Sequence, residues 1–513
     1  MKRYSDLEFL RLTKGQKFLY KLTSFFASIP RAIANFFLAI GRFFKNLVVG
    51  IGKEFADVFL TFKNGDWKTK TSFLVMGFGS IARGQVLRGL LFLLFEVVFI
   101  FYMIAAGAHW LGMLPSLGKM GPHEEYDEIL DAYTMAYGDN SFKILLYGVL
   151  TIFFIIAFIY TWRLNVKQNK ISEEYLKAGK RLKSGKDDLR SLVDESFYKT
   201  LLALPLTGIL VFTVMPIVFM ILVAFTNYDG AHDGYNNALF GWVGMENFRT
   251  LLTWSGSGVN YSATFGEILT WTLIWAFFAT FTNYFLGMFV AMMINKKGIR
   301  LKKLWRTILV MTIAIPQFIS LLYVSKMFAK NGIVNGFLLN MGWIDKAIDF
   351  WGSTAHSGLL PRVMVIVINI WIGIPYLMLI ATGILMNIPA DLYESSRIDG
   401  ANAWQQYTKI TLPYMLFITG PYLLTSFTSN MNNFNVIYLL TGGAPTNAAA
   451  SGAAGSVGFT DLLITWLFKI TTGAEAKYYL ASVVGIMVFV VVAAITLVVY
   501  NVLPSIKNEE DFQ

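Results

Sequence analysis

Long apolar runs dominate the chain, and they set the first prediction of its structure. A transmembrane helix needs about 20 mainly apolar residues, and eight stretches approach or exceed that length. A hydrophobic content of 55% with a charged content of only 15% agrees with this pattern and excludes a soluble protein of this length. We predict an all-α polytopic membrane protein with about eight transmembrane helices. The expected spans cover residues 87–112, 143–164, 199–226, 264–295, 307–327, 361–387, 414–442 and 477–503.

The positive charges are distributed unevenly between alternate loops. If both termini face the cytoplasm, the inner segments hold 32 Lys and Arg residues and the outer loops hold five. This asymmetry follows the positive-inside rule and predicts a multi-pass protein of the cell membrane with both termini cytoplasmic. The net charge of +11 then reflects topology and attraction to anionic membrane lipid. We expect no nucleic-acid partner.

Several chemistries lack suitable residues. The chain has no cysteine, which excludes disulfides and thiolate sites, and its four histidines form no HxxH or HExxH pair. We expect no metal site, no catalytic site and no cleaved signal peptide. Gly185-Lys186 is similar to part of a phosphate loop, but Gly179 is one position too distant and Asp187 replaces the required Ser or Thr.

The pattern divides the chain into five regions. Residues 1–86 are apolar but interrupted by basic residues, which predicts amphipathic helices in the cytoplasmic interface, with a poorly ordered arm as the alternative. Residues 87–164 hold two accessory spans. Residues 165–198 carry charges of both signs and predict a cytoplasmic helical linker. A six-helix core over 199–503 and a cytoplasmic tail over 504–513 complete the chain.

Polar residues inside the spans bear on the transport mechanism. Glu96 is the only carboxylate well inside a span, and it either has a functional role or pairs with another helix. The last six spans carry amides instead, namely Asn283, Gln317, Asn369 and those of the run Ser429–Asn435. Amides bind neutral polyhydroxylated ligands through paired donors and acceptors, although interhelical hydrogen bonding uses the same residues.

A polar segment, residues 388–413, separates two of the most apolar spans on the cytoplasmic side. A proline followed by an aspartate favours the start of a short helix over residues 390–398. Gly400 permits a sharp turn, and Asn402 can cap a second helix before Pro413 opens the next span. We expect a helix–turn–helix that fits a groove on a soluble partner, with a plain amphipathic loop as the alternative.

The same segment contains E-S-S-R-I-D-G-A followed by I-T-L-P, which resembles the EAA loop of ABC importer permeases. Two serines replace the two alanines of the family pattern, so these positions stay small. The resemblance implies that the segment docks into a cleft of an ATPase subunit and transmits its motion. The residues to which it assigns this coupling are Glu394, Ser395, Ser396, Asp399, Gly400, Ala401, Ile410, Leu412 and Pro413.

A wider resemblance covers most of residues 199–503. The stretches NIWIGIPYLML, IPQFIS and MNNFNVIYLLTGGAP are similar to the larger permease subunit of maltose and maltodextrin importers. This resemblance implies a second homologous permease subunit, two ATP-binding subunits that hold ATP and Mg, and an extracytoplasmic sugar-binding protein. It implies no cofactor on this chain. The candidate substrate-binding residues are Asn369, Gly373, Tyr376, Asn430 and Asn433, to which we add the amide Gln317.

The sequence also departs from that family. Ile313 and Gln317 stand where the best-known member has Tyr and Ser, and Ser429 stands where it has Phe, which weakens an aromatic platform for a sugar ring. We expect maltose- or maltodextrin-type oligosaccharides as substrate, with another sugar or a polyol as the alternative. A secondary carrier would need coupling carboxylates or an inverted repeat. A membrane-embedded enzyme would need clustered carboxylates, for which the outer-loop stretch HEEYDEILD is the one candidate.

Overall fold

Helices form nearly all the regular structure of the chain. In the computed structural model, an antiparallel hairpin of β1 (His123–Asp127) and β2 (Ala132–Ala136) makes the one sheet within the described residues. The predicted all-α class is therefore confirmed. The residues described are 13–129, 131–182, 184–253, 260–296, 298–450, 456–473 and 476–502.

The chain forms two compact units, which we describe separately. One unit comprises residues 37–247 and 477–482, and the other comprises residues 1–36, 248–476 and 483–513. The third predicted span thus lies in the same unit as the two accessory spans. The domain boundary predicted at residue 199 stays a prediction.

Seven helical segments of the described chain are long and apolar enough to cross a membrane. Three of them contain a π-helical turn, and two of these turns, η2 and η3, directly precede the start of a helix with proline in its first turn. A π turn accommodates the N–H that proline lacks, so the helix continues through the site. The segments are α5 (Val86–Tyr102) with η1 (Met103–Gly107) and α6 (Ala108–Met113); α7 (Ser141–Lys177); α9 (Phe197–Ile209) with η2 (Leu210–Val214) and α10 (Met215–Val223); α12 (Tyr261–Asn295); α16 (Ala355–Met386); α18 (Ala403–Gln406) with η3 (Tyr407–Thr411) and α19 (Leu412–Met431); and α22 (Tyr478–Val502).

The predicted span 307–327 is wrong as a continuous helix. The structure divides it into α13 (Lys302–Ala314) and α14 (Gln317–Met327), whose axes differ by 91°. Pro316 disfavours a helical conformation at Ile315, which adopts an extended backbone with φ −81° and ψ 126°. The pair would count as an eighth span if it crosses the membrane as one unit.

The predicted span 414–442 is also divided. Helix α19 ends at Met431, and the short helix α20 (Phe434–Leu440) follows after two asparagines. At its other end, α19 is continuous with α18, so Pro413 lies within a long helix and does not open one. Proline is tolerated there because the π turn η3 comes immediately before it.

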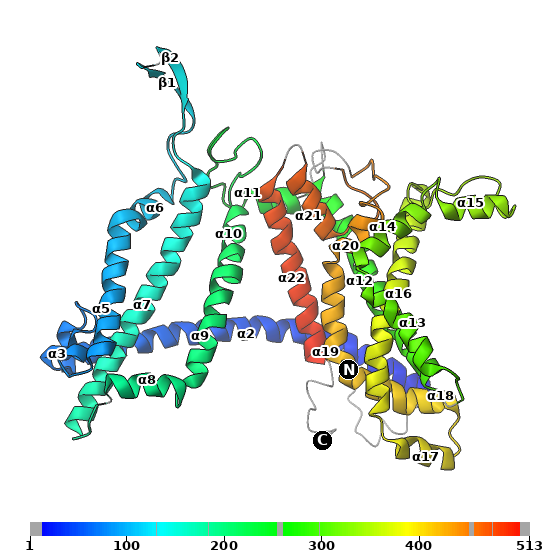
Figure 1. The fold of residues 1–513 in the computed structure, drawn as a ribbon, viewed down its shortest axis with the longest axis horizontal. Coiled ribbons are helices and arrows are strands. Elements are labelled where there is room, and N and C mark those ends of the chain that lie inside the picture. Colours follow the sequence, from blue (N-terminus) through cyan, green and yellow to red (C-terminus); the bar gives the residue numbers. More distant parts are fainter. Residues whose placement is uncertain are drawn as a thin grey trace. The chain divides into compact units, whose positions relative to one another are not determined.

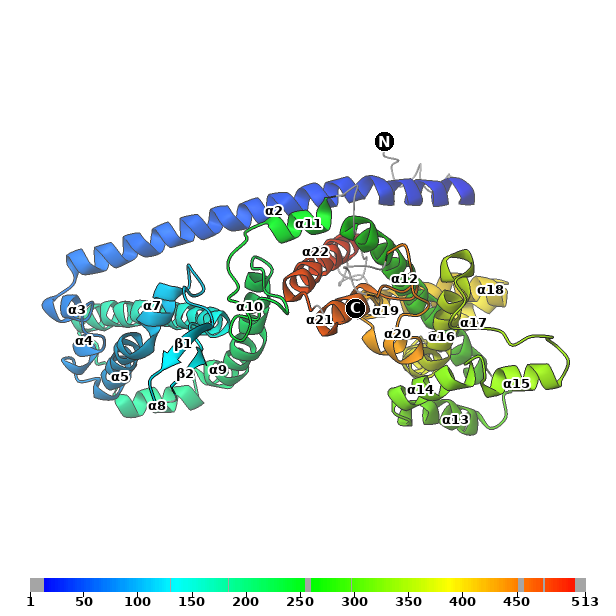
Figure 2. The ribbon, with the colours of Figure 1, turned by 90° about the horizontal axis from the view of Figure 1, so that it is seen from above.

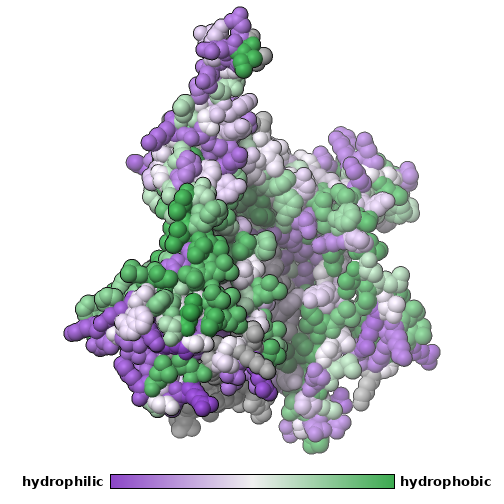
Figure 3. Space-filling model, turned by 60° about the vertical axis from the view of Figure 1, so that its left-hand side comes forward, coloured by the Kyte–Doolittle hydropathy of each residue, from purple (hydrophilic) through white to green (hydrophobic). Residues whose placement is uncertain are grey.

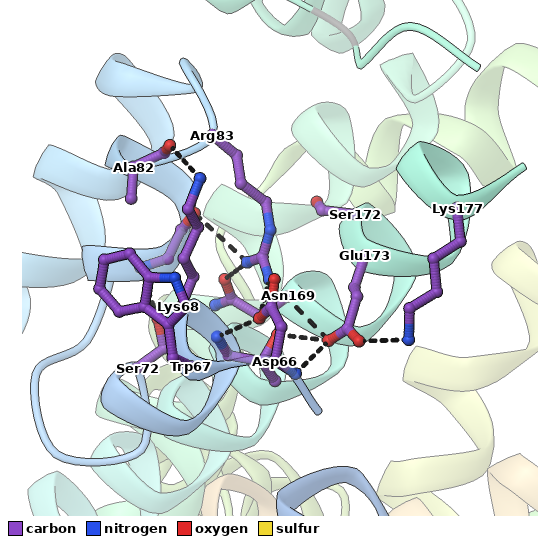
Figure 4. A network of polar contacts seen from close by, with 12 residues as sticks. Asp66, Trp67, Lys68, Ser72, Ala82, Arg83, Asn169, Ser172, Glu173 and Lys177 are labelled. Carbon is purple, nitrogen blue, oxygen red and sulfur yellow. Dashed lines mark hydrogen bonds and ion pairs between the residues drawn. The ribbon is translucent and has the colours of Figure 1, made fainter. Parts of the chain in front are cut away.

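The unit that holds the accessory spans is joined at one end by a polar network (Figure 4). The side chain of Arg83, 1% exposed, donates to Asp66 Oδ1 at 2.6 Å and to Asn169 Oδ1 at 2.8 Å. Glu173 accepts a hydrogen bond of 2.8 Å from the Thr69 hydroxyl. These bonds hold the short helices α3 (Trp67–Thr71) and α4 (Phe78–Ile81) against α7.

The same network explains why the predicted linker 165–198 is only partly separate. Its first residues continue the transmembrane helix α7 as far as Lys177, and α8 (Gly185–Val193) follows as an isolated short helix. Residues Asn165 and Asn169 are fully buried because they receive partners from the N-terminal segment. The charge pattern alone did not indicate this packing.

Residues 14–64 form one helix, α2 (Lys14–Asn64), where the sequence predicted more than one (Figure 2). Within the accessory unit this helix exposes aromatic residues such as Phe43, Phe55 and Phe59. Apolar side chains that alternate with basic ones fit an interfacial helix, so that assignment stays a prediction.

The hairpin β1–β2 extends beyond α6 and α7 (Figure 1), and the sequence analysis did not predict it. Tyr126 and Tyr133 face each other across the two strands, with ring centroids 5.4 Å apart. The projecting hairpin is mostly hydrophilic, whereas the helices below it present a hydrophobic surface (Figure 3). This contrast agrees with helices in lipid and a hairpin in water.

The second unit packs α12 against α16 and α19. One buried cluster gathers Trp271, Trp275, Leu321, Val365 and Ile437, and another gathers Tyr284, Met288, Met378 and Met415. The two clusters involve different parts of α12 and α16, with polar residues at intervening positions of both helices. The remaining helices are α11 (Glu246–Leu252), α15 (Ile333–Asn340), α17 (Ala390–Ile398) and α21 (Leu463–Thr472).

Candidate functional site

Two adjoining cavities lie among the helices of the second unit. The smaller, about 150 Å³, is called here the amide cavity, and it is lined by Ala279, Asn283, Gln317, Asn369, Ile372, Gly373, Tyr376, Leu377, Tyr422, Ser426 and Asn430. The larger, about 450 Å³, shares Gln317, Ile372 and Tyr376 with it and adds Thr312, Ile313, Ile315, Pro316, Ser320 and Trp371. Together they fall in the size range of small-molecule sites, roughly 300–1,000 Å³.

Helical periodicity brings the polar residues of α16 to one face. Asn369, Gly373 and Tyr376 follow one another at spacings of four and three residues, which places them on the same side of the helix. Pro375, within the helix, donates no hydrogen bond to the Trp371 carbonyl and so loosens this turn. The cavity wall therefore coincides with a weak point in the helix.

The other walls come from three more helices. Tyr422, Ser426 and Asn430 lie four residues apart on α19 and face the amide cavity. Gln317 reaches it because the break at Pro316 makes this glutamine the first residue of α14. The broken span, which the sequence analysis did not predict, thus contributes directly to the site.

The lining suits a neutral ligand. Among the described residues that line either cavity there are amides, hydroxyls, aromatic rings and aliphatic side chains but no charged group. Amides supply both donors and acceptors, and aromatic faces supply apolar contact. The arrangement can bind a polyhydroxylated molecule without requiring a counter-ion.

The predicted sugar-binding residues are not all placed alike. Five of the six line the amide cavity: Asn369, Gly373, Tyr376, Asn430 and Gln317. Asn433 does not line it, because its Oδ1 accepts from the Val436 N–H at 3.3 Å and caps α20. Asn430 is partly engaged, since its Nδ2 donates to Thr280 Oγ1 at 3.0 Å. The role of these residues in binding sugar stays a prediction.

The cavities contain further residues that the sequence analysis did not select as substrate-binding. Asn283 was recognised as an intramembrane amide but was not placed in the site. Trp371 lies two residues from Asn369 and brings an aromatic ring to the larger cavity, where Ile313 and Ser429 had left such a ring in doubt. Its proximity in sequence to a candidate residue was the available signal. Tyr422 and Ser426 offered no signal beyond their spacing from Asn430.

The segment 388–413 folds as predicted into two helices joined by a turn. Helix α17 covers Ala390–Ile398, and Gly400 adopts φ +77°, a conformation that favours glycine. Asn402 caps the second helix by accepting from the Gln405 N–H at 2.9 Å, while the Gln405 side chain returns a bond to Asn402 N–H at 2.8 Å. The cap predicted at Asn402 is confirmed as a capping box.

The two helices are held together by side-chain hydrogen bonds. Gln406 Nε2 donates to Ser396 Oγ at 2.8 Å, and the hydroxyls of Tyr393 and Thr411 lie 2.9 Å apart. A surface cavity of about 270 Å³ lies between the helices and is lined by Ser396, Asp399, Gly400, Ala401, Gln405, Gln406, Lys409 and Ile410. Four predicted coupling positions, Asp399, Gly400, Ala401 and Ile410, therefore meet in one place together with Ser396.

The other predicted coupling residues lie around this cavity. Glu394 is exposed, and Ser395 donates to the carbonyl of Asp391 at 2.8 Å, a bond within its own helix. Leu412 packs against the buried cluster around Met415, and Pro413 follows it in the first turn of α19. The loop is therefore fixed at its base and exposed at its tip.

Glu96 has a structural partner. Its buried carboxylate accepts a hydrogen bond of 2.8 Å from the Met76 N–H in the segment before α4. Of the two predicted roles, this geometry favours the structural one. The described residues contain no group of three or more metal-ligating side chains.

Comparison with known proteins agrees with this geometry. Residues 283–508 match the family model of the binding-protein-dependent transport system inner membrane component. A maltodextrin transport system permease protein of Streptococcus pneumoniae is 31% identical over 85% of this chain and 96% of its own length. A galactooligosaccharides transport system permease protein of Bacillus subtilis is 31% identical over 85% of this chain and 97% of its own length.

A solved bacterial ABC transporter involved in alginate import covers 61% of this chain and 97% of the matched chain, with 21% identity and a TM-score of 0.49. The similarity to the two permeases extends over most of both proteins, including the accessory unit. The chain is a membrane-embedded permease subunit and belongs to the family of binding-protein-dependent transport system inner membrane components.

Proposed function

We propose that this chain translocates maltodextrin-type oligosaccharides across the cell membrane as one of two homologous permease subunits of an ATP-driven importer. The observation that carries this proposal is the lining of the two cavities, where amides, hydroxyls and the rings of Trp371 and Tyr376 surround a space without charged side chains among the described residues. Sugars present hydroxyls and apolar ring faces, which these groups complement. The similarity to maltodextrin permeases supports the same substrate class.

The proposed coupling runs through the segment 388–413. Apolar side chains at its tip are exposed, with Ile398 88% and Trp404 70% accessible on this chain. Such residues on a polar cytoplasmic loop fit burial against a protein partner. We assign that partner to an ATP-binding subunit, which Glu394 would contact. Closure of the two ATP-binding subunits would then move α17 and, through the Tyr393–Thr411 pair, the span α19.

The remaining partners follow from the same scheme. A second homologous permease would complete the pathway, two ATP-binding subunits would hold ATP and Mg, and an extracytoplasmic binding protein would deliver the sugar. This chain itself would bind no cofactor. Both termini would face the cytoplasm, because the loops on that side hold most of the Lys and Arg residues.

Galacto-oligosaccharides are a second candidate substrate. A relative named for them is as similar to this chain as the maltodextrin permease is. The cavity lining offers no group that selects one neutral sugar over another. Another sugar or a polyol would use the same coupling segment.

Purification of the intact complex tests the proposal. The chain is tagged at its C-terminus, the membranes are solubilised gently, and co-purifying proteins are identified by mass spectrometry. We expect an ATP-binding subunit, a second permease and a sugar-binding protein that binds maltotriose. Recovery of this chain alone after crosslinking would contradict the assembly, and a binding protein selective for galacto-oligosaccharides would replace the substrate.

A further inference from the structure

Two neighbouring asparagines in the amide cavity have unpaired polar atoms. Asn283 on α12 and Asn369 on α16 are both more than nine-tenths buried, and both line the cavity. The Oδ1 atom of Asn283 and the Nδ2 atom of Asn369 have no hydrogen-bond partner among the described residues. Buried polar atoms without a partner are uncommon and costly, so each one requires an explanation.

The orientation of the Asn283 amide is fixed by its other contacts. Its Nδ2 donates to the Ala279 carbonyl at 2.8 Å and lies 3.5 Å from the Asn369 carbonyl. Both neighbours are acceptors, so the atom that faces them must be the nitrogen. The oxygen therefore remains as an unused acceptor beside the unused donor of Asn369.

A comparison within α12 shows that this arrangement is specific to Asn283. Asn295, on the same helix, likewise donates to the carbonyl four residues earlier, at 2.8 Å from Ala291. Its Oδ1, however, accepts from Arg306, and its Nδ2 also reaches Thr382 Oγ1 at 3.3 Å. Asn295 therefore acts as an interhelical hydrogen-bonding residue, which Asn283 does not.

Gly373 makes room for the Asn283 amide. A Cβ atom at this position would lie 2.5 Å from Asn283 Nδ2, 2.7 Å from its Cγ and 2.8 Å from its Oδ1. The backbone of Gly373 is helical, so glycine is required here by space and not by conformation. The sequence analysis considered Gly373 as a sugar contact, and the structure gives it this additional positioning role.

We propose that Asn283 is a ligand-binding residue, and that its Oδ1 and Asn369 Nδ2 together bind one hydroxyl of the transported sugar. A hydroxyl donates one hydrogen bond and accepts others, so it satisfies an acceptor and a donor at once. Gly373 is the positioning residue that lets the amide reach this place. The proposal rests on the proposed function only in taking the ligand to be a neutral sugar.

The test uses the complete transporter with its binding protein, in proteoliposomes loaded with ATP. Uptake of labelled maltotriose and of its monodeoxy analogues is measured for the parent, Asn283→Leu, Gly373→Ala and the control Asn295→Leu. We expect Asn283→Leu and Gly373→Ala to raise the apparent KM for maltotriose about tenfold, the effect of one lost hydrogen bond to a buried partner. One monodeoxy analogue should bind the parent about tenfold more weakly yet be insensitive to Asn283→Leu.

The melting temperatures of the sugar-free complexes provide a readout that does not depend on transport. Asn283→Leu removes an unpaired oxygen, so we expect an unchanged or raised melting temperature, whereas Asn295→Leu should lower it. A fall with Asn283→Leu as large as that with Asn295→Leu, or an unchanged pattern of analogue selectivity, would overturn the proposal.

The two proposals can fail separately. If the parent imports a galacto-oligosaccharide and not maltotriose, the substrate proposal fails, and the monodeoxy analogues of that sugar test Asn283 in the same way. If it imports neither, the function proposal fails, and the melting temperatures decide on Asn283. An unchanged value would support an amide reserved for a ligand, and a fall would show a structural role.

Discussion

The hydroxyl groups of Tyr393 and Thr411 lie 2.9 Å apart. Tyr393 belongs to α17, the first helix of the coupling segment, and Thr411 ends the π turn that continues into α19. The bond therefore joins the exposed part of the segment to the span that carries Tyr422, Ser426 and Asn430 of the amide cavity. A displacement of α17 has a short mechanical path to the cavity wall.

Tyr393→Phe should weaken coupling without preventing assembly. The substitution removes one hydroxyl pair, worth about 1 kcal/mol, and keeps the aromatic ring. We expect the sugar transported per ATP hydrolysed to fall about two- to fivefold, as measured in proteoliposomes. Tyr198→Phe, at an exposed tyrosine of α9, is the matched control and should leave the ratio unchanged. An equal fall in both variants would contradict the proposed path.

Glu394→Lys should uncouple ATP hydrolysis from transport. The side chain is exposed on α17, so the change leaves the packing of this chain intact while it reverses the charge offered to the ATP-binding subunit. We expect uptake to fall at least tenfold while the complex still hydrolyses ATP, because a lost interfacial charge pair is worth several kcal/mol. Glu174→Lys reverses an exposed charge on α7 as a control. If uptake by Glu394→Lys stays at the parental level, the mechanical role of the loop is wrong.

Glu96→Leu should affect stability and not transport. The carboxylate accepts the only hydrogen bond recorded for the Met76 N–H, and its loss leaves that buried group unpaired within the described part of the chain. We expect the free energy of unfolding to fall by about 1–3 kcal/mol, seen as a lower melting temperature. Glu96→Gln retains an acceptor and should restore most of the loss. A Glu96→Gln variant that is stable but inactive would instead assign Glu96 a function in transport.

Acid should weaken the network around Asp66. Burial opposes ionisation of this carboxyl, but hydrogen bonds from the Thr69 backbone, the Thr69 side chain and Arg83 outweigh it and hold its pKa below the ordinary 3.8. A lowered pKa means that the ionised group stabilises the fold above pH 3.8 and that this contribution is lost as the pH falls below that value. The difference in melting temperature between the parent and Asp66→Asn should therefore shrink as the pH falls below 3.8. A difference that stays constant would contradict the assignment.

Much of the fold could be predicted from local rules. Spans follow from apolar length, and the turn at Gly400 and the cap at Asn402 follow from the conformations these residues favour. The break at Pro316 was predictable in principle, because a residue before proline avoids the helical region. Pro413 shows the limit of that rule, since a preceding π turn keeps the helix continuous there.

The site was less predictable, because it depends on contacts between distant segments. The helical spacing of Asn369, Gly373 and Tyr376 indicated one face of a helix, but only packing shows that Asn283 lies against Gly373. The sequence gave Asn433 and Asn430 equal weight, whereas Asn433 caps α20 and does not line the cavity. The partners of Asn165 and Asn169 come from a segment more than 80 residues away, so composition could not indicate them.

The central claim is that ATP hydrolysis drives oligosaccharide import through this chain, and uptake of labelled maltotriose into proteoliposomes tests it most directly. The vesicles hold the complete transporter, the binding protein is outside, and ATP is enclosed or omitted. We predict uptake that requires enclosed ATP and is lost with Glu394→Lys. Uptake that proceeds without ATP, or that follows an imposed proton gradient, would contradict the account.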